Sequence, residues 1–411
     1  MMREIDTDVC VVGGGPAGLV LALLMLRSGA RVTVVERARA HQRAFRGEIL
    51  QPGAMALLDA LDVLDGARAR GAHQHDRFLV IEGDRVLLEA DYRLLPAPHD
   101  HLLSVPRPHL LDELLTRCRR SPGFRYLPGR RADGLLRRDG TVVGVIAEGP
   151  QGRCVVRARV VVGADGRCSR IRRLAGIGAG RAEPFAQDVL WCTLIARRGE
   201  PPVRDVRVLR TGGGPVLVYG SWPDRIQIGW TLPHRRYRHL AALGPDHVKE
   251  RLARAVPQYA TLIRDQIRGP ADLGVLDVFS ARAERWAADG LVLIGDAAHT
   301  HSPIGAQGIN LAVQDAVVLH PLLVRALAEG DTCAERLAEF ERRRGPDIAA
   351  VMRMQTLQSR AILSRGTFTT RVRPRLARAL RRTPLYRKVL QRMAYGNPSI
   401  RIADAGMCGR T

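Results

Sequence analysis

Lysine is almost absent from this chain. Of its 64 basic residues only Lys249 and Lys388 are lysines, so the formal net charge of +23 is carried almost wholly by arginine. We attribute this bias to a GC-rich genome, because neither aromatic interleaving nor a nucleic-acid-binding motif accompanies the arginines. No nucleic-acid partner is therefore expected.

The chain also lacks the cysteine and histidine patterns of disulfide frameworks and metal sites. Its seven cysteines are scattered without a C-x-x-C pair, and its start is acidic where a signal peptide would be basic. We therefore expect reduced thiols, no signal peptide and a cytoplasmic location. No metal is expected either, because His99, His101, His299 and His301 belong to no H-E-x-x-H or Cys/His cluster.

What the chain does contain is a glycine motif close to its start. Gly13, Gly15 and Gly18, with Pro16 and Ala17 among them, fit the spacing G-x-G-x-x-G directly after an apolar run. In such a motif the first glycine permits a tight turn from strand to helix, and the second lets the backbone approach a pyrophosphate. The third lets helix and strand pack closely.

A helix and a second strand continue this motif. Residues 17–27 are rich in leucine and alanine and predict a helix whose amino terminus faces the phosphates. The strand predicted over 31–35 ends at Glu36, which Arg37 follows. An acid about 20 residues past the glycines lies where a ribose hydroxyl needs a carboxylate. This part of the chain is therefore predicted to bind a dinucleotide.

A second glycine motif, Gly295-Asp296-Ala297-Ala298-His299, follows the apolar run 291–294 much later in the chain. Together the two motifs predict FAD, held at both ends by one discontinuous domain. The predicted fold is α/β, with three parts. They are a Rossmann-type FAD-binding domain (1–72, 102–180 and 275–345), an inserted mixed or antiparallel β-sheet domain for substrate (73–101 and 181–274), and a basic carboxy-terminal helical segment (346–411).

No second Rossmann motif is found for a nicotinamide cofactor. Gly212-Gly213-Gly214-Pro215 lies between two predicted strands and indicates a hairpin turn. The glycine cluster at 176–180 has Arg181 where a third glycine is needed. NAD(P)H is therefore expected to bind transiently in a surface groove.

Three motifs, taken in order, resemble the class A flavoprotein monooxygenases, the group typified by para-hydroxybenzoate hydroxylase. They are the first glycine motif with Glu36, Asp165-Gly166 in VVVGADGRCSRIRR, and Asp296 in LVLIGDAAHTHSPIGAQGINLAVQDA, and the resemblance covers residues 5–345. It implies an enzyme that uses NAD(P)H and O2 to form a flavin C4a-hydroperoxide. That species would hydroxylate or epoxidise a lipophilic aromatic or unsaturated small molecule, in specialised, antibiotic-type metabolism.

The resemblance also implies which residues contact FAD. Asp296 would bond the ribityl chain, and Asp165 would lie near the pyrophosphate and shape the nicotinamide approach. Arg46 and Arg107 match arginines of the family that hold the phosphate and ribityl region. The other implied contacts are backbone groups, one against the adenine and four against the flavin ring: Ala132, then Gly305, Gly308, Ile309 and Asn310.

One stretch resembles a different group of flavoenzymes. Residues 46–53, RGEILQPG, are similar to an Arg/Gly-Glu-x-Leu-Gln-Pro-Gly signature of squalene epoxidases. The Trp-x-Trp-x-x-Ile signature of flavin halogenases is missing, so halogenation is disfavoured. Two alternatives stay open at this point: a dehydrogenase or reductase of the same fold that inserts no oxygen, and a non-enzymatic FAD-binding partner protein.

The substrate side carries no motif of its own. Tyr219 and His234 are candidates for a catalytic acid or base, against the alternative that both are packing or surface residues. The hydroperoxide must be kept from water, so an apolar pocket is expected. Its expected wall is the middle sheet, through Trp191, Leu217, Tyr219, Trp222 and Trp230.

The end of the chain is strongly basic. Residues 360–411 carry 13 basic side chains and one acid, Asp404. Within 366–411 apolar residues such as Leu385, Val389 and Met393 recur at helical spacing, which predicts a helix packed on the FAD domain. The same pattern also suits a helix on anionic lipid or a dock for an acidic carrier protein.

Overall fold

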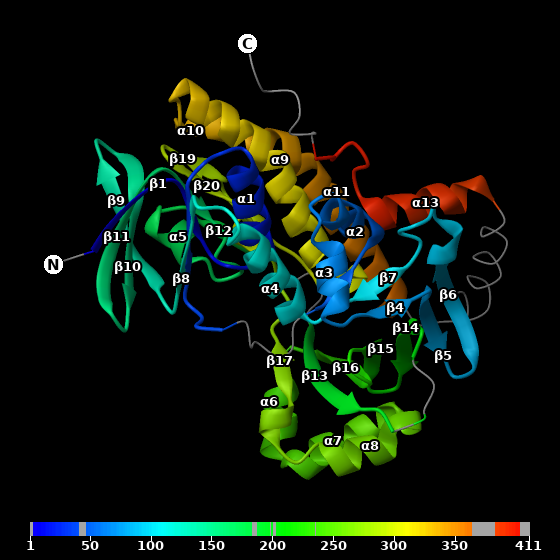
Figure 1. Ribbon diagram of the computed structural model, residues 1–411. Coiled ribbons are helices and arrows are strands. Elements are labelled where there is room, and N and C mark those ends of the chain that lie inside the picture. The colour runs from blue at the N-terminus through cyan, green and yellow to red at the C-terminus, as the bar shows by residue number, and fades with distance from the viewer. Residues whose placement is uncertain are drawn as a thin grey trace.

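The computed structural model describes residues 3–40, 47–182, 187–197, 199, 203–234, 236–363 and 383–402. Two large sheets dominate the fold, and each carries helices (Figure 1). We call them the nucleotide sheet, which holds both glycine motifs, and the substrate sheet. Two small sheets complete the described strands: β3 (Ile49–Leu50), β7 (Leu102–Ser104) and β4 (His73–His75), and β12 (Ala179–Ala182), β18 (Ser280–Ala283) and β21 (His299–Thr300).

The nucleotide sheet joins strands from distant parts of the chain. β1 (Arg3–Val12) pairs in parallel with β2 (Val32–Glu36) and with β11 (Gly152–Gly163). β11 in turn pairs in parallel with β20 (Leu291–Leu293). The carboxyl ends of β1 and β20 therefore bring the two glycine motifs to one edge. The remaining strands are β8 (Phe124–Pro128), β19 (Ala287–Ala288), β9 (Arg131–Arg138) and β10 (Thr141–Gly149).

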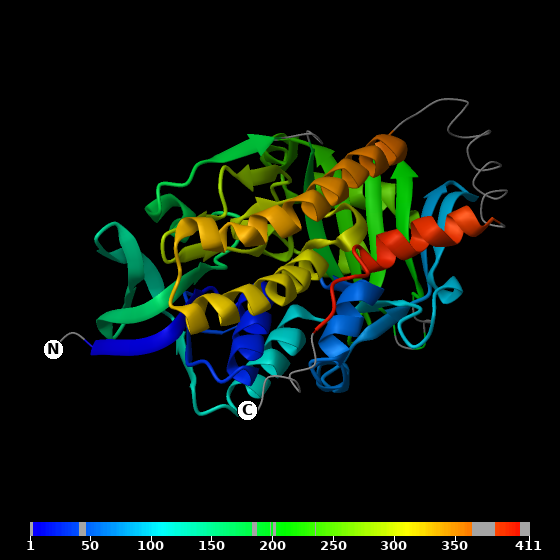
Figure 2. The same cartoon turned by 90° about the horizontal axis from the view of Figure 1, so that it is seen from above.

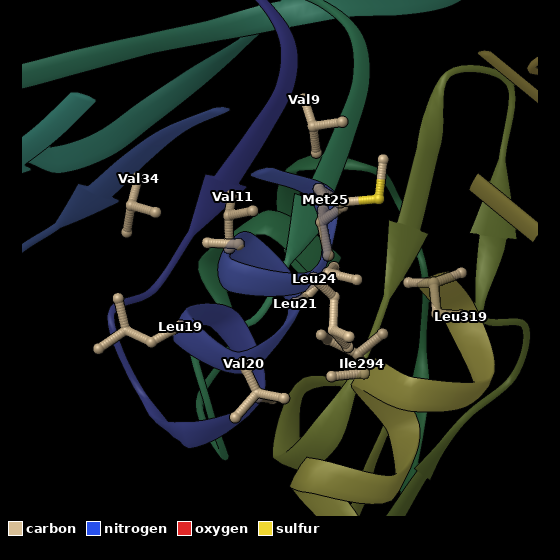
Figure 3. Packing of buried hydrophobic residues seen from close by; sticks show 14 of the residues in the cluster. Val9, Val11, Leu19, Val20, Leu21, Leu24, Met25, Val34, Ile294 and Leu319 are labelled. Carbon is tan, nitrogen blue, oxygen red and sulfur yellow. The ribbon is translucent and has the colours of Figure 1, made fainter. Parts of the chain in front are cut away.

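Two helices bury the core of this sheet. α1 (Pro16–Arg27) and α9 (Gly308–Glu329) pack against each other and the sheet, with Leu21 and Met25 of α1 near Leu319 of α9 (Figure 3). The segment Ile304–Glu329 is long and apolar enough to cross a membrane by length and composition, but 61% of its most apolar stretch is buried inside the protein. That composition suits a helix enclosed on most sides.

The substrate sheet is mixed, as predicted. Its order is β17-β13-β16-β15-β14-β5-β6, antiparallel except where β14 runs parallel to β5. β5 and β6 form a hairpin, which joins this sheet at its edge. The bounds are β5 (Arg77–Glu82), β6 (Arg85–Asp91), β13 (Gln187–Ile195), β14 (Asp205–Thr211), β15 (Gly214–Ser221), β16 (Arg225–Pro233) and β17 (Gly274–Leu276).

Alternation along the strands gives the substrate sheet two apolar faces. On β13, Leu190 and Leu194 pack with α6 (Arg236–Ala242), α7 (Pro245–Ala255) and α8 (Ala260–Gln266). Val189 and Trp191 point to the opposite face. That second face is turned toward the rest of the molecule and borders the site described below.

Helices from the carboxy-terminal part cross this second face. α11 (Glu339–Leu363) runs beside α9, and α13 (Pro384–Tyr395) lies next to α2 (Pro52–Asp59) and β6 (Figure 2). The predicted tail helix is thus partly described, as α13. The fold class is confirmed as α/β, with a parallel nucleotide sheet and an additional mixed sheet. The other helices are α3 (Leu64–Ala69), α4 (Arg107–Cys118), α5 (Arg170–Leu174) and α10 (Ala334–Leu337).

Candidate active site

The first glycine motif forms a turn that tolerates no side chains at two positions. Gly13 has φ +116°, and a Cβ there would collide with the backbone carbonyl of Ala164. A Cβ at Gly18 would collide with the carbonyl of Gly13, so only glycine lets α1 pack so close to β1. Gly15 is the amino-terminal cap of α1, and Pro16 is its first residue. The free N–H groups of this helix end can bind phosphate.

Glu36 is fixed beside this turn. Its carboxylate accepts the N–H of Gly14 at 2.7 Å and the N–H of Ala38 at 2.7 Å. The carboxylate is therefore positioned at the end of β2, where a ribose hydroxyl is expected, with lone pairs left to accept it. The next residue, Arg37, is exposed.

Arg107 lies over the phosphate turn. It is the first residue of α4, and its Nη2 would be 3.4 Å from a Cβ built on Gly15. This position supports the predicted phosphate contact. Ala132 is buried at the start of β9, beyond the end of β2, where Arg130 donates its N–H to the carbonyl of Glu36 at 2.9 Å. Arg46, the other predicted arginine, lies outside the described residues.

The two glycine motifs touch in space. Gly295 has φ +58°, and a Cβ there would lie 3.3 Å from the Cβ of Ala17, at the start of α1. Asp296 follows in a short 3-10 helix (Gly295–Ala297) and is half-buried beside the turn. At the glycines of both motifs the space next to the backbone has no side chain. Together with Glu36 and Asp296 they form a cradle that fits FAD.

A buried ion cluster supports the second motif. Asp315 of α9 accepts the N–H of Gly295 at 2.9 Å, pairs with His299 at 2.7 Å and pairs with Arg344 of α11 at 2.8 Å. Burial alone would raise the pKa of Asp315, but the adjacent His299 and Arg344 outweigh burial and lower it. Sequence reasoning missed Asp315 and Arg344. The available signal was an acid in the middle of an apolar helix.

Asp165 has a structural role at the start of α5. Its carboxylate accepts the hydroxyl of Ser169 and the N–H groups of Arg170 and Ile171, so it caps the start of α5. Arg172 of α5 then donates to the carbonyl of Ala297 at 3.0 Å. Asp165 therefore holds the second motif in place through α5, and its contact with the pyrophosphate stays a prediction.

The turn before α9 is held by side-chain amides, and we call residues 302–308 the flavin turn. Gly305 and Ala306 have φ of +76° and +51°. Gln51 donates to the carbonyl of Gly305 at 2.9 Å, and Asn310 donates to that of Ala306 at 2.7 Å. α9 begins at Gly308, and Gly308 is exposed. The first N–H groups of α9 have no partner within the helix, and those of Gly308 and Ile309 belong to residues that are not buried.

Gln355 of α11 adds to this support. Its amide donates to the carbonyls of Ser302 and Ile304, both at 2.9 Å. Gln51 is further held by the hydroxyl of Tyr92 at 3.0 Å. Gln51 belongs to the RGEILQPG stretch, although that resemblance assigned it no contact, whereas Gln355 belongs to no motif.

A cavity of about 360 Å³ lies between the flavin turn and the inner face of the substrate sheet. Its walls are mostly apolar. The sheet contributes Phe78, Val189, Trp191, Val206 and Leu217, among others. The opposite wall comes from α11 and α13, through Gln358, Ile362, Tyr386, Val389, Leu390 and Met393. Among the described lining residues none carries a positive charge.

The two catalytic candidates lie outside the described lining of this cavity. Tyr219 is 2% exposed and packs edge-on against Trp191, and burial raises the pKa of its phenol far above the ordinary value. His234 bonds Asp188 at 2.8 Å at the end of β16. Asp277 lies with this pair but also binds Arg181 at 3.0 Å, so an ion-pair cluster explains the group. A catalytic role for Tyr219 or His234 stays a prediction.

The predicted aromatic wall needs correction in part. Trp191 and Leu217 line the cavity, as expected. Trp230 points to the other face of the sheet, where it packs with the cluster under α6–α8. Trp222 is 43% exposed and stacks edge-on with His109. The sequence pattern could not separate the two faces, because both are apolar.

Comparisons with known proteins agree with this site. The model of the FAD binding domain family matches residues 6–355. The 6-methylpretetramide 4-monooxygenase of Streptomyces rimosus is 56% identical over 396 residues, covering 96% of this chain and 94% of that protein. A 12-dehydrotetracycline 5-monooxygenase/anhydrotetracycline 6-monooxygenase from the same species is 28% identical, covering 86% of this chain and 69% of that protein.

Solved structures share the fold. PqsL of P. aeruginosa, in complex with 2-aminobenzoylacetate, is 27% identical, with a TM-score of 0.76 over 89% of this chain and 98% of that one. The glycine cradle, the family match and the 56% identical monooxygenase agree on the cofactor and on the reaction class. The chain belongs to the FAD-binding family of class A flavoprotein monooxygenases and is an FAD-dependent monooxygenase that uses NAD(P)H and O2.

Proposed function

We propose that the protein hydroxylates 6-methylpretetramide or a similar fused-ring aromatic compound in antibiotic-type metabolism. The observation that carries this proposal is the 56% identity to the Streptomyces rimosus enzyme over nearly the whole of both chains. The cavity supports it, because its long apolar walls suit a flat, neutral, multi-ring molecule.

We further propose how the chain's residues serve the reaction. The first motif, Glu36 and Arg107 would bind the pyrophosphate and ribose of FAD, and Asp296 would bind the ribityl chain. Bound FAD, once reduced by NAD(P)H, supplies the chemistry that activates O2 and transfers one oxygen atom to the substrate. The N–H groups at the start of α9 would stabilise negative charge on the reduced ring.

The cavity walls would exclude water from the reaction. Leu217, Trp191 and Leu390 present apolar surface on opposite sides of the substrate space. Dry walls favour oxygen transfer because they limit loss of the reactive species to water. We propose the division into an FAD domain and an inserted substrate domain on the same basis, with the cavity between them.

In this proposal, helix α13 of the carboxy-terminal tail forms part of the wall of the substrate cavity. Tyr386, Leu390 and Met393 of α13 line the cavity. A packed helix therefore explains part of the apolar spacing noted in the sequence. A contact of the rest of 366–411 with anionic lipid or an acidic carrier protein, and a cytoplasmic location, stay predictions.

The test is a turnover assay with the FAD-loaded protein. We expect 6-methylpretetramide to accelerate NAD(P)H oxidation and to gain one oxygen atom that comes from isotopically labelled O2. Removal of O2 should stop product formation, whereas a reductase of the same fold would continue. Unchanged NAD(P)H oxidation on adding 6-methylpretetramide would contradict the proposed substrate.

4-Hydroxybenzoate serves as a control compound. Its carboxylate would have to leave water for a cavity whose described lining offers no cation, and an unpaired buried charge is costly. We therefore expect no acceleration by 4-hydroxybenzoate.

A further inference from the structure

α13 is fastened at both ends, to the two parts of the molecule that border the cavity. Near its start, the hydroxyl of Tyr386 donates to the carbonyl of Glu89 at 3.0 Å and accepts the N–H of Asp91 at 3.1 Å, both at β6. At its end, Gln307 donates to the carbonyl of Met393 at 3.0 Å and Gln314 donates to that of Tyr395 at 3.0 Å. α13 therefore spans from the substrate sheet to α9.

The bonds at the end of α13 satisfy groups that a helix leaves open. The last carbonyls of a helix have no partner within the helix, so side-chain amides can bind them. Gly396 ends α13 with φ +66°, and a Cβ there would lie 3.2 Å from the amide nitrogen of Gln314. The fit of α9 against the end of α13 is thus close and specific.

Gln307 occupies the junction between α13 and the flavin turn. It directly precedes α9, follows Ala306 with its φ of +51°, and lines the cavity beside Met393. Its backbone belongs to the flavin turn, while its side chain bonds a helix whose Leu390 and Met393 line the substrate space. One residue therefore touches both sides of the reaction space.

We infer that Gln307 is a positioning residue that couples substrate contact on α13 to the placement of the flavin turn. A substrate that packs against Leu390 and Met393 fixes the last turns of α13. The Gln307–Met393 bond transmits that constraint to the backbone on which the flavin ring rests. The inference rests on the proposed placement of FAD and substrate. Loss of this coupling should lower the efficiency of oxygen transfer and leave the binding of FAD unchanged.

The variant Gln307→Met tests this coupling, because methionine keeps the length of the side chain and removes the N–H donor. In the FAD-loaded full chain with saturating 6-methylpretetramide, we expect product formed per NAD(P)H oxidised to fall about fivefold, the factor that one lost hydrogen bond represents. Hydrogen peroxide should rise in proportion, and the change in flavin absorption on adding substrate should shrink. Coupling and absorption change equal to those of the unmodified protein would overturn the inference.

Tyr386→Phe is the matched comparison, because it removes the other anchor of α13 and keeps the ring. It should raise the KM for 6-methylpretetramide while product per NAD(P)H oxidised stays the same. If Tyr386→Phe uncouples the reaction as strongly as Gln307→Met, the specific role of Gln307 is refuted.

A measurement without substrate separates this inference from the proposed function. Hydrogen exchange of residues 384–395 in the FAD-loaded protein should become faster in Gln307→Met, most of all in the last turn of α13. Equal exchange in both proteins would refute the coupling. If the unmodified protein fails to oxidise 6-methylpretetramide, the proposed substrate fails, while the exchange result still decides the role of Gln307.

Discussion

The buried charges beside the second glycine motif act as one unit. Arg344 is 1% exposed, and its guanidinium contacts Asp315, Asp347 and Gln314. Removing one member would leave an unpaired buried charge. The resulting loss in the free energy of unfolding would exceed the stabilisation that the intact pair contributes. The cluster therefore fixes the backbone at Gly295, and through it the place of Asp296.

Residue spacing predicted one kind of site residue well. The glycines of both motifs and Glu36 lie where the spacing placed them, because a strand-to-helix turn has few possible geometries. The contacts of supporting residues could not be predicted, since their partners are backbone groups that are distant in sequence: the RGEILQPG stretch marked Gln51 without its partner, and no motif marked Gln355. The capping of α5 by Asp165 could not be predicted either, because it depends on how the chain folds around residues 165–171.

A buried histidine gives a prediction at this scale. His75 is 0% exposed, and burial lowers its pKa to about 3, whereas an unfolded chain binds a proton near pH 6.5. Between these pH values the unfolded state binds more protons, so the free energy of unfolding should decrease as pH falls below 6.5. The contribution of one such group is at most about 1.4 kcal/mol per pH unit.

The variant His75→Phe removes this titration. Urea unfolding between pH 6.5 and 4 should show a shallower loss of stability with falling pH in the variant than in the unmodified protein. Identical slopes would contradict the assignment to His75.

Single elements have sharply distinct faces, and β15 shows this most clearly. Leu217 lines the cavity, whereas Val218 is 1% exposed in the cluster under α6–α8. Alternation predicted the strand but not which face meets the substrate, since both are apolar. The parallel pairing of β14 with β5 was equally inaccessible, because local patterns say nothing about partners far away in sequence. Likewise, helical spacing in the tail predicted a packed helix but not that it would line the cavity.

A pair of neighbouring substitutions tests the two faces. Leu217→Trp should fill the cavity and raise the KM for 6-methylpretetramide at least tenfold, with little change in the free energy of unfolding. Val218→Trp should overpack the other face and destabilise the protein by about 1–3 kcal/mol. Steady-state kinetics and urea unfolding of both variants give the answer. Weakened substrate binding in Val218→Trp alone would reverse the assignment of faces.

At the scale of the whole molecule, the FAD cradle joins segments that the chain separates widely. The turn after β1, Arg107 and the motif after β20 converge on one place, where Gly295 meets Ala17. A ligand bound there connects all three segments and stabilises only the folded state. FAD should therefore contribute to overall stability as well as to catalysis.

Removal of FAD tests this expectation. At a free FAD concentration 100 times the dissociation constant, binding contributes about 2.7 kcal/mol. The stripped protein should have a Tm several degrees lower, and added FAD should restore the Tm in a concentration-dependent manner. A Tm that does not respond to FAD would contradict the assignment of the cradle.

The position of β20 in the nucleotide sheet also constrains how the protein is made. β1 is translated long before the strand that completes the parallel edge beyond β11, which begins only at Leu291. At roughly 5–20 residues per second, translation needs about 15–60 s to reach it. During that interval the apolar surfaces of β1 and α1 have no α9 to pack against, so we expect the nascent chain to be prone to aggregation.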